Sequence, residues 1–146
     1  MLPSIELLLS NDHEAIDGLY EKYLESKTAK SNHALRAFQS YTSALLHHIK
    51  CEEELIFPAL SRTPMERAAQ EVPNLLEEHQ IIFPLLSLVE SQLAQGIDST
   101  SAERKLFEEL HEHNAREEMH VYSPLDRLLS ESEKKSVMNF METRNN

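Results

Sequence analysis

Two short stretches of the sequence decide its fold: HIKCEE at positions 48–53 and HNAREE at positions 113–118. In each stretch a glutamate stands four positions after a histidine, and an aromatic residue and then a proline follow. Residues four apart lie on the same face of an α-helix, one above the other. Each stretch therefore predicts a helix that directs an imidazole and a carboxylate toward one point.

Each of these helices is preceded by one that carries a single histidine. The first contains DHEAI at positions 12–16, and the third contains EHQII at positions 78–82. The second half of the chain thus repeats the first, with one single-histidine helix and one helix that carries His and Glu a turn apart. A bundle with pseudo-two-fold symmetry would bring all four helices around one axis.

The composition and the apolar periodicity predict helices along the chain. Only 2 glycines and no tryptophan occur among 146 residues, and a shortage of glycine disfavours β-turns. Apolar residues recur at steps of three and four, the period of an amphipathic helix. We expect four long helices over about residues 12–26, 31–57, 74–95 and 101–122, and a short fifth helix over about 131–142.

Capping residues and prolines mark the expected helix ends. The first helix has three candidate N-cap residues, Ser10, Asn11 and Asp12. Pro58 is expected to stop the second helix and Pro73 to interrupt the chain before the third, which ends at Gly96. Ser130 and Glu133 form a capping box that opens the short C-terminal helix.

Helices of this length, joined by short loops, favour an all-α fold: an antiparallel up-down-up-down four-helix bundle with a short C-terminal helix. A chain of 146 residues is the size of one domain. We therefore expect a single domain over residues 1–146. Its bundle core covers about residues 11–125, and its C-terminal helix covers about 131–142.

Six residues with metal-binding side chains fall on the helix faces that should line the core: His13, His48, Glu52, His79, His113 and Glu117. Imidazole nitrogen suits iron, zinc, manganese or copper, and a carboxylate can bridge two cations through its two oxygens. These six residues can bind two ions, with two histidines on each ion and both glutamates bridging the pair. The two ions would lie about 3.5–4 Å apart, the distance usual for two-metal sites. The sequence therefore predicts a two-metal centre in the core.

A single His-x-x-x-Glu pair has a simpler interpretation, because most such pairs are solvated and stabilise a helix only slightly. A lone histidine on an apolar face is likewise more often a hydrogen-bonded core residue than a ligand. Here, however, both glutamates fall on inward faces. Two buried carboxylates that face each other are strongly destabilising without a cation. The duplicated pattern therefore favours metal binding.

Further residues are expected to line a pocket or to support the ligands: Ile16, Asp17, Leu45, Ile49, Ile82, Phe83 and His120. Asp17 stands four positions after His13 and either hydrogen-bonds its imidazole or lies at the edge of the inward face. His120 shares the helix face of the fourth-helix ligands, so it is a candidate ligand or a pocket-lining residue. Glu53 and Glu118 are expected to be solvated.

The charge and the cysteine content restrict the partners and the compartment. The formal net charge is −11 at pH 7, which argues against nucleic acid and anionic membranes as partners. Cys51 is the single cysteine and cannot form an internal disulfide, so it is either a buried small residue or a weakly reactive thiol. The apolar run at the N-terminus is too short for a signal peptide or a membrane span. A soluble cytoplasmic protein is therefore expected.

With these residues identified, the chain resembles the hemerythrin-like (HHE cation-binding) family. The resemblance runs from Asn11 to Tyr122 and includes both H-x-x-x-E-E motifs and the two single-histidine motifs. It implies a four-helix bundle around two iron ions joined by an oxo or hydroxo bridge, with zinc or manganese as alternatives. The six residues named above are the ligands that it implies, and oxygen, nitric oxide or peroxide is the small-molecule partner.

One position departs from the oxygen-carrying members of that family. The carriers use a fifth histidine one turn after the third-helix histidine, and here that position is Phe83. A missing ligand leaves an open or water-filled coordination position on the iron. Such a position disfavours reversible oxygen carriage and is compatible with reactions of peroxide or nitric oxide. The centre thus resembles the family's iron–sulfur repair and stress-response relatives more than its carriers. The N-terminal cysteine-bearing segment of the repair proteins is not found in this sequence, which argues against that role.

Three functions are compatible with these residues. The first, which we favour, is a non-haem di-iron protein that binds oxygen, nitric oxide or peroxide for sensing, storage or stress response. The second is a di-iron enzyme with peroxidase or nitric-oxide-metabolising activity. The third is a structural or signalling bundle that binds zinc or iron.

Overall fold

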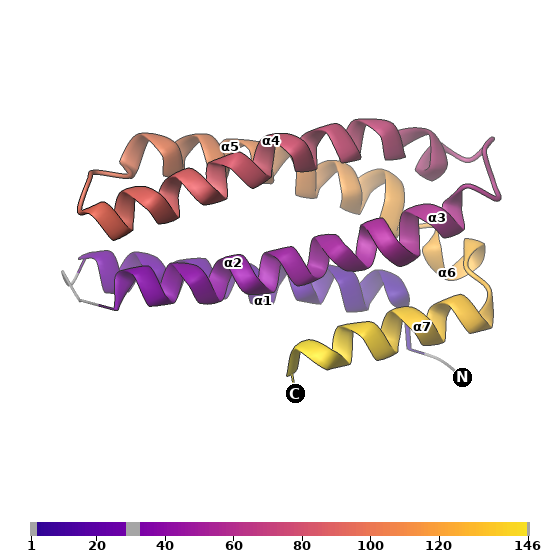
Figure 1. Cartoon of the computed structure of the whole chain (residues 1–146). Helices are drawn as coiled ribbons and strands as arrows, with labels where there is room; N and C mark the ends of the chain where they lie inside the picture. Colours follow the sequence, from indigo (N-terminus) through magenta and orange to yellow (C-terminus); the bar gives the residue numbers. More distant parts are fainter. Residues whose placement is uncertain (1–2, 29–32, 146) are drawn as a thin grey trace.

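The computed structural model describes residues 3–28 and 33–145, and all regular structure in these ranges is helical (Figure 1). Four long helices account for most of it: α1 (Ile5–Thr28), α2 (Ala34–Cys51), α4 (Arg67–Gln95) and α5 (Thr100–Arg116). The shorter elements are two π-helical turns, η1 (Glu52–Ile56) and η2 (Glu117–Tyr122), the helices α3 (Phe57–Leu60), α6 (Leu125–Leu128) and α7 (Glu131–Glu142), and a tighter helical turn, η3 (Thr143–Asn145). The all-α prediction is confirmed.

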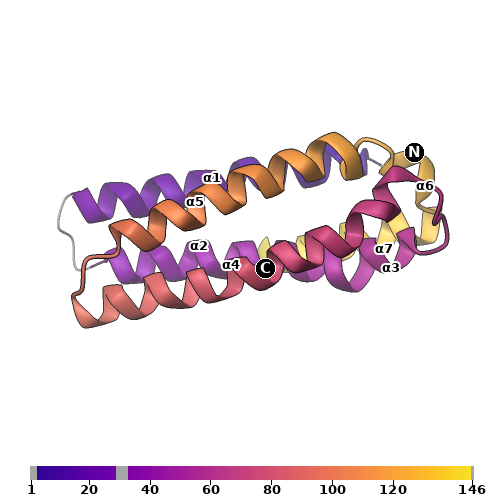
Figure 2. The same cartoon turned by 90° about the horizontal axis from the view of Figure 1, so that it is seen from above.

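The long helices pack in two layers. Figure 1 shows α1 and α2 side by side beneath α4 and α5, and Figure 2 shows the same helices from above. Contacts join α1 to α2 and α4 to α5 within the layers, and they join α2 to α4 and α1 to η2 between the layers. The helix α7 lies on the outer side of the first layer, where it contacts α1 and α2. The inward faces of the four long helices therefore meet between the layers.

The helix α1 begins at Ile5, well before the predicted N-cap residues around Asp12. Its first amide groups are capped by a residue from the far end of the sequence, because Asp126 accepts hydrogen bonds from the backbone N–H groups of Ile5 at 2.7 Å and Glu6 at 3.3 Å. The hydroxyl of Ser4 donates to the same carboxylate at 2.8 Å. The predicted start was wrong because this cap comes from tertiary structure. The start predicted for the second helix, at residue 31, lies outside the described residues.

Neither Pro58 nor Pro73 ends a helix, contrary to the sequence prediction. After α2 the chain continues through η1, where the N–H of Phe57 bonds to the carbonyl of Glu52 five residues back, and into α3. Pro58 lies in the first turn of α3, where a missing N–H is tolerated. The helix α4 includes both Pro73 and Pro84. Residues before and after Pro73 are buried, so packing outweighs the lost backbone hydrogen bond.

Two predicted helix ends are present in the structure. Gly96 ends α4 in a left-handed conformation with φ of 71°, which a residue without Cβ adopts at little cost. The capping box at the start of α7 is formed, because Glu133 N–H donates to Ser130 Oγ at 3.1 Å and Ser130 N–H donates to Glu133 Oε1 at 2.8 Å. None of the described helices combines the length and the apolarity that a bilayer crossing requires.

The core consists of two apolar clusters with polar residues between them. The first cluster includes Ile5, Leu9, Cys51, Ile56, Leu75, Val121, Tyr122 and Val137. The second cluster includes Ile16, Phe38, Leu45, Ile49, Ile82, Leu86 and Leu106. On α1, Leu9 belongs to the first cluster and Ile16 to the second, and the buried side chain of His13 lies between them in the sequence. This fold therefore places a buried polar layer across the middle of the bundle.

Candidate metal centre

The six predicted ligands come together in this polar layer. They form two groups in which potential ligand atoms all lie within 4.8 Å of one another: His13, His48, Glu52 and Glu117 in the first group, and Glu52, His79, His113 and Glu117 in the second. All six side chains are buried. The two groups share both glutamates, so the arrangement has the pseudo-two-fold character of the repeated motifs.

Each of the two glutamates presents one oxygen to each group. The oxygen–Nε2 distances are 3.5 Å for Glu52 Oε2–His48, 3.4 Å for Glu52 Oε1–His79, 3.3 Å for Glu117 Oε1–His13 and 3.3 Å for Glu117 Oε2–His113. A carboxylate placed in this way can bridge two cations, one through each oxygen.

The other ring nitrogen of every one of these histidines contacts a carboxylate. The Nδ1–oxygen distances are 3.2 Å for His13–Glu118, 2.8 Å for His48–Asp12, 2.6 Å for His79–Glu53 and 2.8 Å for His113–Glu78. Because a carboxylate accepts hydrogen bonds, Nδ1 is the donor in each contact, and Nε2 is the ring atom left to bind a cation. Histidine ligands of metal sites are held and oriented in the same way.

The sequence offers Asp17 as a partner of His13 or as a residue at the edge of the inward face, and it does not identify these four supporting carboxylates. Glu118, instead of Asp17, contacts the Nδ1 atom of His13. Glu53 and Glu118 are not simply solvated, because each accepts a hydrogen bond from a histidine on another helix. Glu53 reaches His79 on α4, a contact that depends on how η1 and α4 pack. Periodicity within a single helix carries no information about such a contact.

Two buried oxygens of the centre lack a partner. Glu52 Oε1 and Glu117 Oε2 accept no hydrogen bond from any described residue, and both glutamates are 0% exposed. These oxygens face His79 and His113, whose Nε2 atoms lie 3.2 Å apart. An unpaired buried carboxylate oxygen is strongly destabilising. A cation between them would satisfy both oxygens, so the residues of the centre fit a metal ion.

The electrostatics of the centre favour positive charge. Burial by itself lowers the pKa of His48, but nearby carboxylates, Glu52 foremost, outweigh burial and raise it to about 10. Carboxylates also outweigh burial at His79 and His113, and the pKa of each is raised. Burial raises the pKa of Glu52, yet its contacts with Glu117 and the imidazoles hold that pKa well below its usual range. The Glu52 carboxylate therefore stays charged, and His48, His79 and His113 hold protons until a cation replaces them.

A seventh residue, Tyr122, enters the centre. Its Oη atom donates to Glu52 Oε2 at 2.6 Å and lies 3.1 Å from Glu117 Oε1. It also lies 2.8 Å from His48 Nε2 and 3.1 Å from His13 Nε2. Burial and the two carboxylates raise the pKa of this phenol well above its usual value. The signal for this residue in the sequence is the aromatic position that follows both His-x-x-x-Glu motifs.

His120, which the sequence leaves as a candidate ligand, supporting group or pocket-lining residue, is not a member of either group of potential ligands. It is half-buried, and its Nε2 atom lies 3.4 Å from Nη2 of Arg67. The reason is the π-helical turn η2, which bonds residues five apart and so inserts one extra residue into the turn. In a regular helix the residue above Glu117 stands three or four positions later. In η2 it is Tyr122, five positions later.

The remaining predicted pocket residues lie beside the centre. Four of them are buried members of the second apolar cluster: Ile16, Leu45, Ile49 and Ile82. Phe83 is partly buried against the same cluster, and its ring centroid lies 6.2 Å from that of His79. These side chains make one end of the centre apolar, which limits the access of water.

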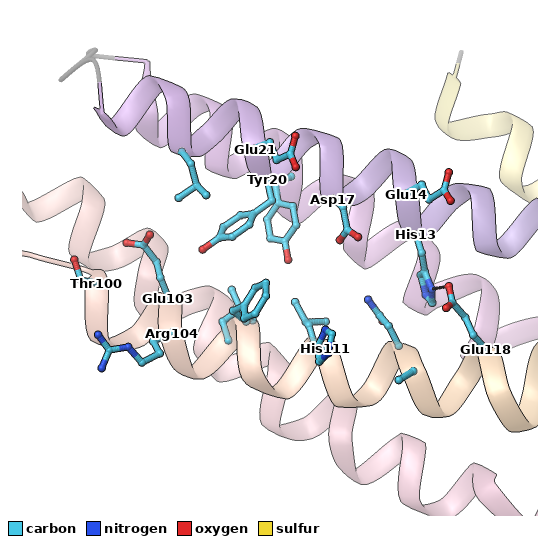
Figure 3. Close-up of a pocket in the computed structure, with 17 residues that line it drawn as sticks. His13, Glu14, Asp17, Tyr20, Glu21, Thr100, Glu103, Arg104, His111 and Glu118 are labelled. Carbon is cyan, nitrogen blue, oxygen red and sulfur yellow. Dashed lines mark hydrogen bonds and ion pairs between the residues drawn. The ribbon is translucent and has the colours of Figure 1, made fainter.

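A cleft of about 830 Å³ runs between α1 and α5 and reaches the centre at His13. Figure 3 shows His13 and Glu118 together at one end of this cleft, with Tyr20 and Asp17 further along α1. Its walls combine aromatic and aliphatic side chains with several carboxylates. A volume of this size is typical of ligand pockets, and it is more than sufficient for a diatomic molecule or peroxide.

Comparison with known proteins agrees with this geometry. A family model described as the hemerythrin HHE cation binding domain matches residues 5–134. No curated protein and no solved structure matches the chain significantly. The family match extends from the first residue of α1 into α7, and so includes all six residues of the two groups. The chain therefore belongs to the hemerythrin HHE cation-binding domain family.

Proposed function

We propose that this protein holds two iron ions and uses them to bind oxygen, nitric oxide or peroxide. One ion is bound by His13 and His48, the other by His79 and His113, and Glu52 and Glu117 bridge the pair together with an oxo or hydroxo group. One observation carries the proposal: each of the two carboxylates presents one oxygen to each histidine pair.

Iron is the metal that the donor set and the family support best. Four imidazoles and two carboxylates are ligands that iron, zinc and manganese all accept. Ferrous iron supplies the chemistry that the small molecules require, because it binds oxygen and nitric oxide and donates electrons to peroxide. Zinc lacks redox chemistry, so a zinc-bound chain would act as a structural or signalling bundle.

The protein residues orient the ligands and control access. The carboxylates at the Nδ1 atoms hold each imidazole with its Nε2 atom toward the centre. The apolar side chains of the second cluster restrict water on one side. The cleft between α1 and α5 offers a small molecule a route to the edge of His13.

The fold that we propose with this centre is an antiparallel up-down-up-down four-helix bundle. The contacts between α1 and α2, between α4 and α5, and between the two layers support it. In this arrangement α7 is the additional C-terminal helix, and it covers the outer side of α1 and α2.

Metal analysis of the purified chain tests the proposal. We expect two irons per chain in the wild type and a loss of at least one iron in His48→Ala and in Glu117→Ala. His47→Ala is the matched control, because His47 neighbours His48 but stacks on Phe140 and contacts Thr143. Wild-type iron content in His48→Ala would contradict the site.

Reaction of the ferrous protein with oxygen, nitric oxide and hydrogen peroxide then separates binding from catalysis. A stable, reversible spectral change with one of these molecules supports a binding protein. Repeated turnover of peroxide or nitric oxide above the rate of free iron would instead identify an enzyme. A wild-type chain that takes up only zinc and no iron would exclude both functions.

A further inference from the structure

The hydroxyl of Tyr122 lies in the middle of one half of the centre. Its Oη atom is within 3.1 Å of one atom from each of four residues: His13 Nε2, His48 Nε2, Glu52 Oε2 and Glu117 Oε1. These residues are the first of the two potential metal groups. The phenol oxygen therefore points at the place where their ligand atoms converge.

The local backbone and the packing keep the ring in this place. The turn η2 brings Tyr122 above Glu117, the residue at which η2 begins. The side chain is 0% exposed and belongs to the first apolar cluster. A cation bound by the four residues around Oη would therefore lie beside the phenol oxygen.

No described residue places such a hydroxyl in the other half of the centre. Phe57 takes the corresponding position, five residues after Glu52, and its ring stacks on His79 with 6.0 Å between the centroids. On that side Glu52 Oε1 and Glu117 Oε2 have no hydrogen-bond partner among the described residues. Tyr122 is a partner of the opposite oxygens of the same carboxylates. The two halves are therefore chemically unequal.

We propose that Tyr122 is a metal ligand, bound as a phenolate to the ion held by His13 and His48. The inference rests on the proposed two-metal function. Metal bonds to nitrogen and oxygen ligands are about 2.0–2.2 Å long, so an ion bonded to these histidines and carboxylates lies within reach of Oη after a small shift of the ring. On binding, the phenol O–H bond breaks, its proton leaves to water, and the oxygen lone pair forms the bond to the metal.

This ligand gives the two ions different surroundings. The ion at His13 and His48 would have Tyr122 in addition to two histidines and the two shared carboxylates. The described residues offer no fifth ligand to an ion at His79 and His113. The ion at His79 and His113 would then keep more open coordination positions than the ion at His13 and His48. The asymmetry follows from a single hydroxyl that distinguishes Tyr122 from Phe57.

The optical and resonance Raman spectra of the ferric protein test the proposal. A phenolate bound to Fe(III) produces a visible charge-transfer band, and excitation in that band enhances tyrosinate ring vibrations. We expect both features in the iron-loaded wild type and their complete loss in Tyr122→Phe. Tyr41→Phe is the matched control and should keep them, because Tyr41 is a buried tyrosine that packs on Tyr20 and Phe38.

A second measurement needs no variant and therefore does not depend on the folding of Tyr122→Phe. Wild-type protein that contains ring-deuterated tyrosine should shift the enhanced vibrations to lower frequency. A wild type with two irons and no tyrosinate vibrations would overturn the Tyr122 proposal and leave the di-iron proposal standing. Retention of the band in folded Tyr122→Phe would do the same. A wild type that binds no iron would refute both proposals.

Discussion

The contacts between histidines and carboxylates are the residue-level feature on which the proposed centre depends. Each contact uses an Nδ1 atom, which leaves Nε2 directed inward, and each partner comes from a different helical segment of the chain. An imidazole held in this way loses little rotational freedom when it binds a metal, and the carboxylate makes it a better donor. The supporting residues are therefore expected to influence metal affinity almost as strongly as the ligands.

Glu53→Gln should weaken metal binding without unfolding the chain. Glu53 accepts a hydrogen bond from His79 Nδ1 at 2.6 Å, and glutamine removes the negative charge that supports this imidazole. Loss of such a partner lowers metal affinity by about 10–100-fold in typical sites. Competition with a chelator of known affinity measures the change.

The adjacent Glu54 provides the control for this prediction. Its side chain is 56% exposed and pairs with Lys50 at 3.8 Å, so Glu54→Gln should leave metal affinity at the wild-type value. Equal affinities for the two variants would show that the contact between Glu53 and His79 is dispensable.

At the scale of elements, both π-helical turns begin at a glutamate that the two groups of potential ligands share. The turn η1 starts at Glu52 and η2 starts at Glu117, directly after the regular helices that carry His48 and His113. A π-helical turn contains one residue more than the α-helical turn that it replaces, and such turns are frequent at functional sites. Here they bring an aromatic residue above each glutamate. Their effect on register is open to a direct test.

Deletion of Met119 should preserve the centre. Met119 is exposed and lies within η2, so its removal converts the π-helical turn to an α-helical one and keeps Tyr122 above Glu117. We expect wild-type iron content, measured by metal analysis of the folded protein.

Deletion of Ala115 is the matched comparison. Ala115 is also exposed, but it lies in α5 between His113 and Glu117. Its removal rotates Glu117 by about 100° relative to His113, so at least one iron should be lost. If both deletions reduced the iron content equally, η2 would not tolerate the loss of a residue, contrary to the prediction from its geometry.

At the scale of the whole molecule, two apolar clusters enclose a charged layer. The first cluster lies toward α6 and α7, and the second lies toward the opposite ends of the long helices. Without a cation, the raised pKa values of His48, His79 and His113 favour protonated imidazoles beside the carboxylates of this layer. The stability of the metal-free fold is therefore linked to the protonation of buried histidines.

The metal-free protein should lose stability as the pH rises. The folded pKa of His48 is raised from 6.5 to about 10, so the folded state binds a proton more tightly than the unfolded state. The resulting stabilisation is fully present below pH 6.5 and is lost as the pH approaches 10. Its size is on the order of a few kcal/mol. Urea denaturation in the presence of a chelator, repeated across this range, measures it.

His48→Gln should flatten this pH dependence, while substitution of the exposed His111 should leave the slope unchanged. Addition of iron should remove the loss at high pH, because metal binding requires deprotonated imidazoles and strengthens as the pH rises. A metal-free wild type whose stability is constant from pH 6.5 to 10 would contradict the assigned role of His48.

Local periodicity was sufficient to predict the helical class and to identify the six residues that the structure brings together in two groups of potential ligands. The residues His48 and Glu52, and likewise His113 and Glu117, share a helix face because they are four apart, and this holds wherever the helix packs. The repeat of the single-histidine helices then indicated that all four faces meet. The first relation depends on residues close together in the chain and the second on the repetition of a motif, so the sequence alone contains both.

The tertiary structure decided the features that join distant segments. Asp126 caps the helix that begins at Ile5, Glu118 supports His13, and neither contact follows from helical period because the partners lie on different elements. The turn η2 removed His120 from the centre and placed Tyr122 there, since one extra residue in a turn changes the face that every later residue presents. The sequence by itself therefore determined which residues can bind metal, and the packing determined which groups orient them and which phenol joins them.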